Sequence, residues 1–297
     1  MDKKRKIAFK QTDIRKATVF GIFLLLLTIS LLSFGCKSQS KTTSNTNIRT
    51  VTISAHRGGP LAGYPENALE TLQNTSNMVD GIMMEIDVLP TRDSVLVLMH
   101  DKTLDRTSTL KGYVKDYTLE EIKKGFLVDG NQEKTKFRVP TLRTVFEWLK
   151  AKNAFLSIDV KDKTTFRQVI DLIREYKVLD KTEVITYSLR DAESVHQYDS
   201  EINLSVSLGS STVFEKLLGS DINISKVSAF TGLTLKDTLF YQKLKQKGIV
   251  VTLGTIGNLD NRAKARGYQL FNEWTKLGID RFATDNYIPV HKALILK

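Results

Sequence analysis

The chain has 297 residues, of which 41% are hydrophobic and 26% charged, a composition typical of globular proteins that excludes disordered and fibrous classes. Its formal net charge is +11, and the first 35 residues contribute +5 through seven Lys or Arg and two Asp or Glu. The remaining basic excess favours an anionic substrate or surface, but no basic stripe interleaved with aromatic residues indicates nucleic-acid binding. A single cysteine excludes an intramolecular disulfide, so the fold must depend on packing, with or without a metal.

Residues 1–35 have the pattern of an export signal. A basic start is followed by an uncharged, strongly apolar run over 18–34, which is shorter than the roughly 20 residues that span a bilayer as a helix. Small residues then precede Cys36, and the segment resembles a bacterial lipoprotein signal. We expect cleavage before Cys36, lipidation of its thiol, and an exported chain anchored to a membrane of a bacterial cell envelope. An uncleaved membrane anchor and a plain cleaved signal are the alternatives, and both also export the chain.

A polar segment without apolar periodicity follows the cysteine. Over 37–50 it is rich in Ser, Thr, Asn and Lys. Such a composition is typical of a flexible tether. We therefore expect residues 36–50, beginning with the lipidated Cys36, to hold a domain away from the membrane.

From residue 51 onward, short apolar runs alternate with amphipathic stretches. The runs predict nine strands, at 51–56, 82–88, 95–100, 155–160, 183–187, 204–208, 226–230, 249–253 and 280–284. The stretches predict helices that include 67–78, 142–152, 164–176, 191–198, 213–218, 235–247 and 262–277. Buried strands separated by helices indicate a parallel sheet. About 250 residues of this pattern fit a (β/α)8 TIM barrel over 51–297, with a doubly wound open sheet as the alternative α/β fold.

Nine strands exceed the eight places of such a barrel. Only six residues separate 82–88 from 95–100, whereas parallel strands need a connection of a dozen or more. We therefore predict that 95–100 returns antiparallel, as a hairpin above the mouth of the barrel. Residues 101–140 then form a small insertion after the second strand and its hairpin, of a length that is usually functional.

Acidic, basic and imidazole groups follow several of these strands. His56 and Arg57 end the first strand, and Gly58 and Gly59 let backbone N–H groups approach an anion. Catalytic groups of such barrels lie at the carboxyl ends of the strands. His100 ends the hairpin, and histidine is the natural acid or base near neutral pH. A capped strand end for His56 and a packed structural role for His100 are the alternatives. We interpret His196 and His291, which lie in helical or terminal contexts, as structural or exposed.

Paired carboxylates indicate a cation. Glu85 and Asp87 share one face of a buried strand, and two acids facing one cavity repel unless a cation lies between them. Asp159 and Lys161 likewise share a face, and we predict a third carboxylate ligand and a phosphate contact there. Hard oxygen ligands favour one Mg²⁺ or Ca²⁺. The alternative is a set of acids held by salt bridges.

These motifs occur in the order found in one enzyme family. The chain resembles the glycerophosphodiester phosphodiesterases, which belong to the phospholipase C-like phosphodiesterases. The matching segments are His56-Arg57-Gly58, Pro65-Glu66-Asn67, Glu85 with Asp87, Thr91 with Asp93, His100-Asp101, Leu104-Asp105-Arg106-Thr107 with Gly112, Pro140-Thr141-Leu142 and Thr284-Asp285. The resemblance covers nearly all of 51–297. It departs at Asp159, where the family has Glu, at Thr252-Leu253-Gly254, where it often has Trp-Thr-Val, and at the end of the last strand.

The resemblance implies the chemistry. It implies hydrolysis of a small-molecule glycerophosphodiester to glycerol 3-phosphate and an alcohol. The residues implied are His56 and His100 as acid and base in an order left open, Glu85, Asp87 and Asp159 as ligands of one Mg²⁺ or Ca²⁺, Arg57 and Lys161 as phosphate contacts, and Glu66 and Asn67 in supporting positions. The nucleophile is water or the neighbouring glycerol hydroxyl. The alternatives are a phosphodiesterase acting on intact phospholipids and a lipoprotein that binds glycerophosphodiesters without turnover.

Overall fold

The computed structural model describes residues 47–296. The predicted signal peptide, Cys36 and most of the predicted tether lie outside the described residues. Among the helices of 47–296, none combines the length and the apolar character that crossing a bilayer requires.

Eight parallel strands close into a barrel. In spatial order they are β1 (Ile53–Ala55), β2 (Met83–Pro90), β4 (Phe155–Val160), β5 (Thr182–Thr186), β6 (Asn203–Ser207), β7 (Val227–Phe230), β8 (Val250–Gly254) and β9 (Arg281–Thr284), which pairs with β1 again. β3 (Leu96–Leu98) pairs antiparallel with β2, so that Leu98 lies opposite Val88. The predicted (β/α)8 barrel and its hairpin are both confirmed, and the open sheet is excluded.

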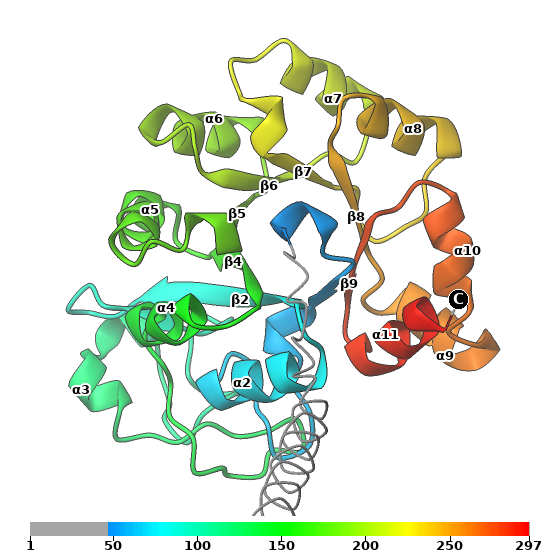
Figure 1. The fold of residues 1–297 in the computed structure, drawn as a ribbon. Coiled ribbons are helices and arrows are strands. Elements are labelled where there is room, and N and C mark those ends of the chain that lie inside the picture. The colour runs from blue at the N-terminus through cyan, green and yellow to red at the C-terminus, as the bar shows by residue number, and fades with distance from the viewer. Residues whose placement is uncertain (1–46, 297) are drawn as a thin grey trace, which may run out of the picture. The chain divides into compact units, whose positions relative to one another are not determined.

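Helices surround the barrel and bury their apolar faces against it (Figure 1). They are α2 (Leu69–Met78), α4 (Leu142–Lys150), α5 (Phe166–Glu175), α6 (Leu189–Tyr198), α7 (Ser211–Leu218), α8 (Thr238–Gln246), α9 (Asn258–Arg266), α10 (Leu270–Lys276) and α11 (Tyr287–Ile295). Side-chain oxygens begin several of them, as where Thr141 accepts from the N–H of Thr144. The prediction of one helix over 262–277 was wrong. Gly267, with φ of 105°, ends α9 and separates it from α10.

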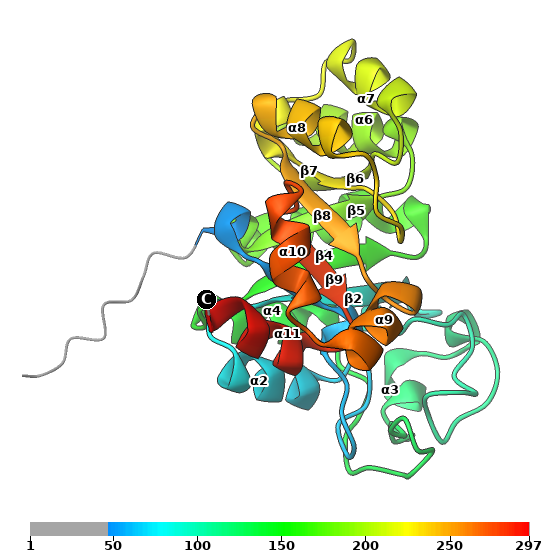
Figure 2. The same cartoon turned by 90° about the vertical axis from the view of Figure 1, so that its right-hand side faces the viewer.

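The insertion over 101–140 is mostly irregular and has a small core of its own. It contains the short helix α3 (Leu119–Ile122), which begins with a capping box between Thr118 and Glu121. Its buried side chains are joined to those of the hairpin in one cluster, made of Ala68, Leu89, Val97, Met99, Leu104, Val114, Ile122, Leu127 and Val139. The insertion lies at one end of the barrel, opposite the amino-terminal turn (Figure 2).

A 3-10 turn, η1 (Ile48–Thr50), precedes β1 at the other end of the barrel. Ile48 is buried, and its carbonyl accepts from Arg281 Nη2 at 2.6 Å. Arg49 donates to the carbonyl of Ser225 at 2.7 Å. Residues 47–50 therefore belong to the barrel domain, which begins earlier than the predicted boundary at residue 51.

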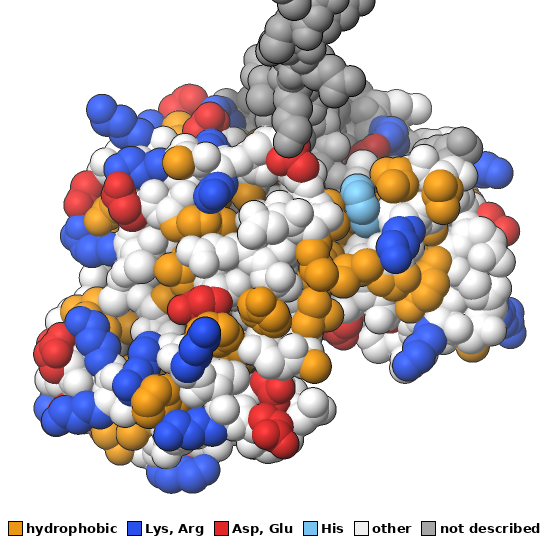
Figure 3. All heavy atoms as spheres, turned by 60° about the horizontal axis from the view of Figure 1, so that its bottom comes forward, with side chains coloured by type: hydrophobic (Ala, Val, Ile, Leu, Met, Phe, Trp, Pro, Cys, Tyr) orange, Lys and Arg blue, Asp and Glu red, His pale blue; other side chains and the backbone are white. Residues whose placement is uncertain are grey.

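Charge on the outer surface is mixed. Exposed ion pairs include Arg143 with Glu175 at 2.5 Å and Lys123 with Glu120 at 2.8 Å. On the face in Figure 3, Lys and Arg side chains are interspersed with acidic and hydrophobic ones. Exposed pairs of this kind contribute roughly 0–1 kcal/mol each, so the stability of the domain comes chiefly from its apolar core.

Candidate active site

The segment after β1 turns sharply and brings His56 and Arg57 over the barrel mouth. It forms a 3-10 turn, η2 (His56–Gly58), in which Arg57 has a left-handed φ of 51°. Gly58 has φ of +84°, and a Cβ there would lie 2.8 Å from Leu72 Cδ2. The site therefore requires glycine at this position, both for its backbone conformation and for its lack of a side chain. The N–H of Asn67 closes the turn by donating to the Arg57 carbonyl at 3.0 Å.

Three carboxylates converge inside the mouth. Glu85 and Asp87 lie two residues apart on β2, and the β2–β4 register places Asp87 beside Asp159. One oxygen of each acid lies within 4.8 Å of the others. Burial, reinforced by the charge of Asp87, raises the pKa of Glu85 well above its usual range. For Asp87 the effect of burial is outweighed by Lys161, whose ammonium lowers the pKa of that carboxyl.

Backbone and amide donors hold two of the acids in place. The N–H of Arg57 donates to Glu85 Oε2 at 2.7 Å. Asn67 Nδ2 donates to Asp87 Oδ2 at 2.7 Å, and its Oδ1 accepts from the Asp87 N–H at 3.0 Å. Asn67 thus has the supporting position that the resemblance implied, directly against a predicted ligand.

The donor set fits a hard divalent cation. Asp159 Oδ1 is buried and has no hydrogen-bond partner among the described residues. Asp87 Oδ1 is approached by the Lys161 ammonium at 2.8 Å. Buried carboxylate oxygens that face one another without a donor raise the free energy of the folded state unless a cation lies between them. The residues present could therefore hold a divalent cation through Glu85, Asp87 and Asp159.

The second oxygen of Asp159, Oδ2, accepts hydrogen bonds from two side chains. Lys161 Nζ lies 2.5 Å from Asp159 Oδ2, and Tyr187 donates its hydroxyl to the same oxygen at 2.6 Å. The predicted phosphate contact Lys161 thus lies beside the acids, paired with two of them. Its contact with phosphate stays a prediction.

Both histidines are oriented by a carboxylate. His56 Nδ1 lies 2.7 Å from Asp285 Oδ1, and His100 Nδ1 lies 2.6 Å from Asp101 Oδ1. A carboxylate accepts a hydrogen bond from Nδ1–H, which leaves Nε2 of each ring facing the cavity for proton transfer. Both rings line the cavity that contains the three acids.

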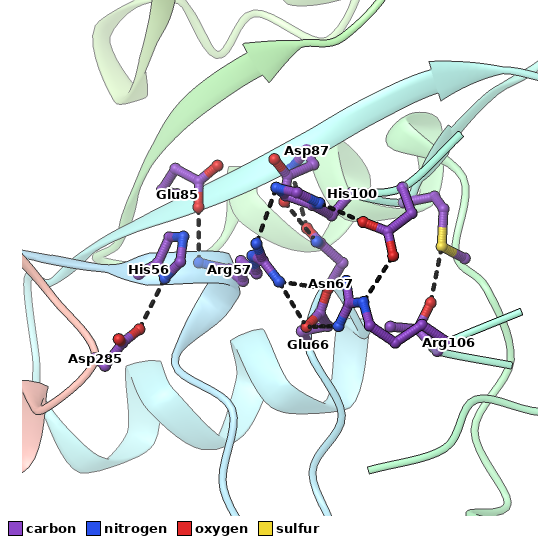
Figure 4. Close-up of polar contacts among 12 residues, drawn as sticks. His56, Arg57, Glu66, Asn67, Glu85, Asp87, His100, Arg106 and Asp285 are labelled. Atoms are coloured by element: carbon purple, nitrogen blue, oxygen red, sulfur yellow. Dashed lines mark hydrogen bonds and ion pairs between the residues drawn. The ribbon is translucent and has the colours of Figure 1, made fainter. Parts of the chain in front are cut away.

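His100 is part of a closed cycle of hydrogen bonds and ion pairs (Figure 4). Arg57 Nη2 donates to His100 Nε2 at 2.9 Å, and Arg57 Nη1 pairs with Glu66 at 3.0 Å. Arg106 pairs with Glu66 through two bonds of 2.8 Å and with Asp101 at 2.6 Å. The Arg106 guanidinium holds the pKa of Asp101 down to about 2. Glu66 is therefore a supporting residue, since it fixes both arginines.

The cavity at the mouth has a volume of about 200 Å³ and two unlike walls. The β1, β2 and β4 side carries the ionisable groups described above. The rest of the wall is uncharged: Ile185 and Tyr187 come from the β5 side, next to β4, and Phe230 and Ile256 come from β7 and the segment after β8. A deeper floor is made by Glu183 and Arg281, which pair with each other at 3.0 Å. His196 and His291 lie on the outer helices α6 and α11.

Sequence reasoning missed four residues of this arrangement. Asp101, Arg106 and Asp285 were recognised as parts of motifs, but no role was assigned to them. Tyr187 was not singled out, although it follows β5 directly and so stands at the catalytic end of a strand. The signal that could have identified Tyr187 is its position directly after the carboxyl end of a barrel strand, where the site lies.

Comparisons with known proteins agree on one family. The model of the "Glycerophosphoryl diester phosphodiesterase family" matches residues 56–286. A glycerophosphodiester phosphodiesterase from Caldanaerobacter subterraneus subsp. tengcongensis is 37% identical over 160 residues, which are 50% of this chain and 63% of that protein. One from Bacillus subtilis is 33% identical over 186 residues, 56% of this chain and 60% of that protein. The match thus spans less than two thirds of these relatives.

Solved structures cover more of the chain. A glycerophosphoryl diester phosphodiesterase from Parabacteroides distasonis superposes with a TM-score of 0.77 at 27% identity, covering 84% of this chain and 87% of its own. An Oleispira antarctica phosphodiesterase, solved with the product sn-glycerol-3-phosphate, has a TM-score of 0.64 at 22% identity, covering 82% and 96%. The latter likeness supports the barrel fold alone.

Proposed function

We propose that this chain, which belongs to the glycerophosphoryl diester phosphodiesterase family, hydrolyses glycerophosphodiesters to glycerol 3-phosphate and an alcohol. One observation carries the proposal: three converging carboxylates and two carboxylate-held imidazoles line the same cavity. Binding a phosphodiester without turnover would not require two oriented imidazoles.

The acids would hold one Mg²⁺ or Ca²⁺, which when bound supplies positive charge to a non-bridging phosphate oxygen. Arg57, whose guanidinium lies against His100, would add charge-assisted hydrogen bonds to the same phosphate. Its Nε is buried without a partner among the described residues, so this donor remains available. Engagement of Arg57 by phosphate also withdraws its Nη2 from His100.

The two histidines divide the proton transfers. Because Arg57 donates to His100 Nε2, that nitrogen carries a lone pair while Nδ1–H donates to Asp101. His100 is therefore poised as the base that removes a proton from the attacking hydroxyl, whether of water or of the neighbouring glycerol carbon. His56, held at Nδ1 by Asp285, then protonates the departing alkoxide from Nε2.

The test uses residues 47–297, since η1 belongs to the domain. Glycerophosphocholine, glycerophosphoethanolamine and glycerophosphoinositol are offered separately with Mg²⁺, with Ca²⁺ and with EDTA. We expect release of glycerol 3-phosphate with metal and its loss with EDTA. A folded sample that releases none with either metal contradicts the proposal. Intact phospholipids and equilibrium binding of glycerophosphocholine are then the next measurements.

We also propose that the chain is exported and anchored to a membrane through lipid on Cys36. The support is the basic start, the apolar run and the single cysteine of the amino-terminal sequence. In a bacterial host, the wild-type chain should incorporate radiolabelled fatty acid and partition with membranes. The Cys36→Ala variant should incorporate no label. Equal labelling of both variants would contradict the anchor.

A further inference from the structure

Tyr187 reaches from the end of β5, the strand next to β4, to the acidic centre. It is the first residue after β5, and the β4–β5 register pairs Asp159 with Ile185 two positions earlier. Its side chain is 60% exposed, yet its hydroxyl donates to Asp159 Oδ2 at 2.6 Å. A largely exposed ring whose polar tip ends on a buried carboxylate is not needed for core packing.

The two oxygens of Asp159 have unlike surroundings. Oδ2 accepts hydrogen bonds from Lys161 and Tyr187, whereas Oδ1 is buried and has no hydrogen-bond partner within residues 47–296. Lys161 alone fixes this carboxylate poorly, because the same ammonium also pairs with Asp87 at 2.8 Å and has a flexible stem. Tyr187 is the donor that Asp159 does not share with another acid.

We infer that Tyr187 is a positioning residue for the metal ligand Asp159, and that its hydroxyl holds Oδ2 so that Oδ1 faces Glu85 and Asp87. Aspartate is one methylene shorter than glutamate, so the direction of its carboxylate decides whether Oδ1 reaches a shared cation. Hydrogen-bond partners that orient ligating carboxylates typically change metal affinity by about 10–100-fold when removed. This inference rests on the proposed function, because it takes Asp159 to be a ligand.

The experiment measures metal binding directly. Mn²⁺ is titrated into metal-free protein of residues 47–297, and free Mn²⁺ is followed by electron paramagnetic resonance. We expect Tyr187→Phe to bind Mn²⁺ about 10–100-fold more weakly than wild type. At saturating metal, its kcat should stay within a few-fold of wild type. Tyr187→Leu, which also removes the ring, should weaken binding at least as much.

A matched control lies on the outside of the barrel. Tyr198 also donates its hydroxyl to a carboxylate, Asp171 Oδ1, at 2.7 Å and is 42% exposed. Tyr198→Phe should leave Mn²⁺ affinity unchanged. In a double-mutant cycle, Asp159→Glu should reduce the loss caused by Tyr187→Phe, since the longer arm depends less on the phenol.

The possible failures are distinguishable. If wild type binds Mn²⁺ and Tyr187→Phe binds it equally well, the inference about Tyr187 is overturned. If wild type itself binds no Mn²⁺ while its circular dichroism shows a folded domain, the metal site of the proposed function fails instead. Equal losses in Tyr187→Phe and Tyr198→Phe would also overturn the inference, because the effect would then not be specific to Asp159.

Discussion

At the scale of single residues, the site is organised by carboxylates that serve different purposes. Asp285 and Asp101 each accept a hydrogen bond from an imidazole, whereas Glu85, Asp87 and Asp159 keep oxygens directed toward one another. The difference follows from the available donors, since Asp101 also has a guanidinium and Asp159 Oδ1 has none. Local partners therefore decide which acids orient the imidazoles and which keep an oxygen open toward the other acids.

Loss of either histidine of the proposed mechanism should abolish most turnover without unfolding the domain. General acid or base catalysis contributes about 10²–10⁴-fold, so we expect His56→Ala and His100→Ala each to lower kcat by that factor. His196→Ala, on the outer helix α6, is the control and should retain activity. Release of glycerol 3-phosphate and thermal melts are measured on all three. A near wild-type rate in either site variant would remove that histidine from the mechanism.

Asp101 should stabilise the fold in a pH-dependent way. Its pKa is lowered to about 2 by Arg106, whereas an unfolded aspartate titrates near about 3.9. The stabilising effect is therefore present above about pH 4 and is lost as pH falls toward about 2. We expect Asp101→Asn to be less stable than wild type at pH 6, with a smaller difference at pH 3. Urea unfolding at both values tests this. A constant difference would contradict the assignment.

At the scale of elements, the sequence predicted the barrel strands and the hairpin, but it did not predict the helix break at Gly267 or the contact made by Tyr187. Buried strands and short connections predicted eight parallel strands and the hairpin because both depend on local patterns. The break at Gly267 was missed, since a single glycine is also tolerated within helices. Tyr187 was missed because its partner is 28 residues away, and no local pattern reports a contact across two strands. The paired acids on β2 were predictable, since alternation alone places them on one face.

The insertion should matter to catalysis through the packing of its own core. Ile122 is fully buried in the cluster that supports the segment carrying Asp101 and Arg106. Ile122→Ala should cost about 2–5 kcal/mol and should also lower kcat, because Arg106 then orients Glu66 and Asp101 less firmly. Leu149→Ala in α4, also fully buried, is the control and should lose stability with kcat retained. Equal effects on kcat would show that the insertion has no specific role.

At the scale of the whole domain, a buried ion pair links β5 with β9, and its arginine also binds the amino-terminal turn. Arg281 on β9 pairs with Glu183 on β5 across the barrel interior, and it donates to the carbonyls of Ile48 and Val51. Ser157 and Ser228 donate to the Glu183 carboxylate at 2.9 and 3.0 Å. The Arg281 guanidinium thus connects β9 with the amino-terminal turn and with the floor of the barrel.

Removing one member of this pair should destabilise the domain more than removing both. Arg281→Met leaves the Glu183 charge buried and unpaired, which typically costs about 3–5 kcal/mol. Glu183→Leu together with Arg281→Met removes the charge itself, so we expect part of that loss to be recovered. The remaining deficit comes from the carbonyls of Ile48 and Val51, which lose their donor in both variants. Urea unfolding of the wild type, the single variant and the double variant gives the comparison. A double variant as unstable as Arg281→Met would mean that Arg281 acts mainly through the amino-terminal turn, and in that case a chain beginning at residue 52 should be equally unstable.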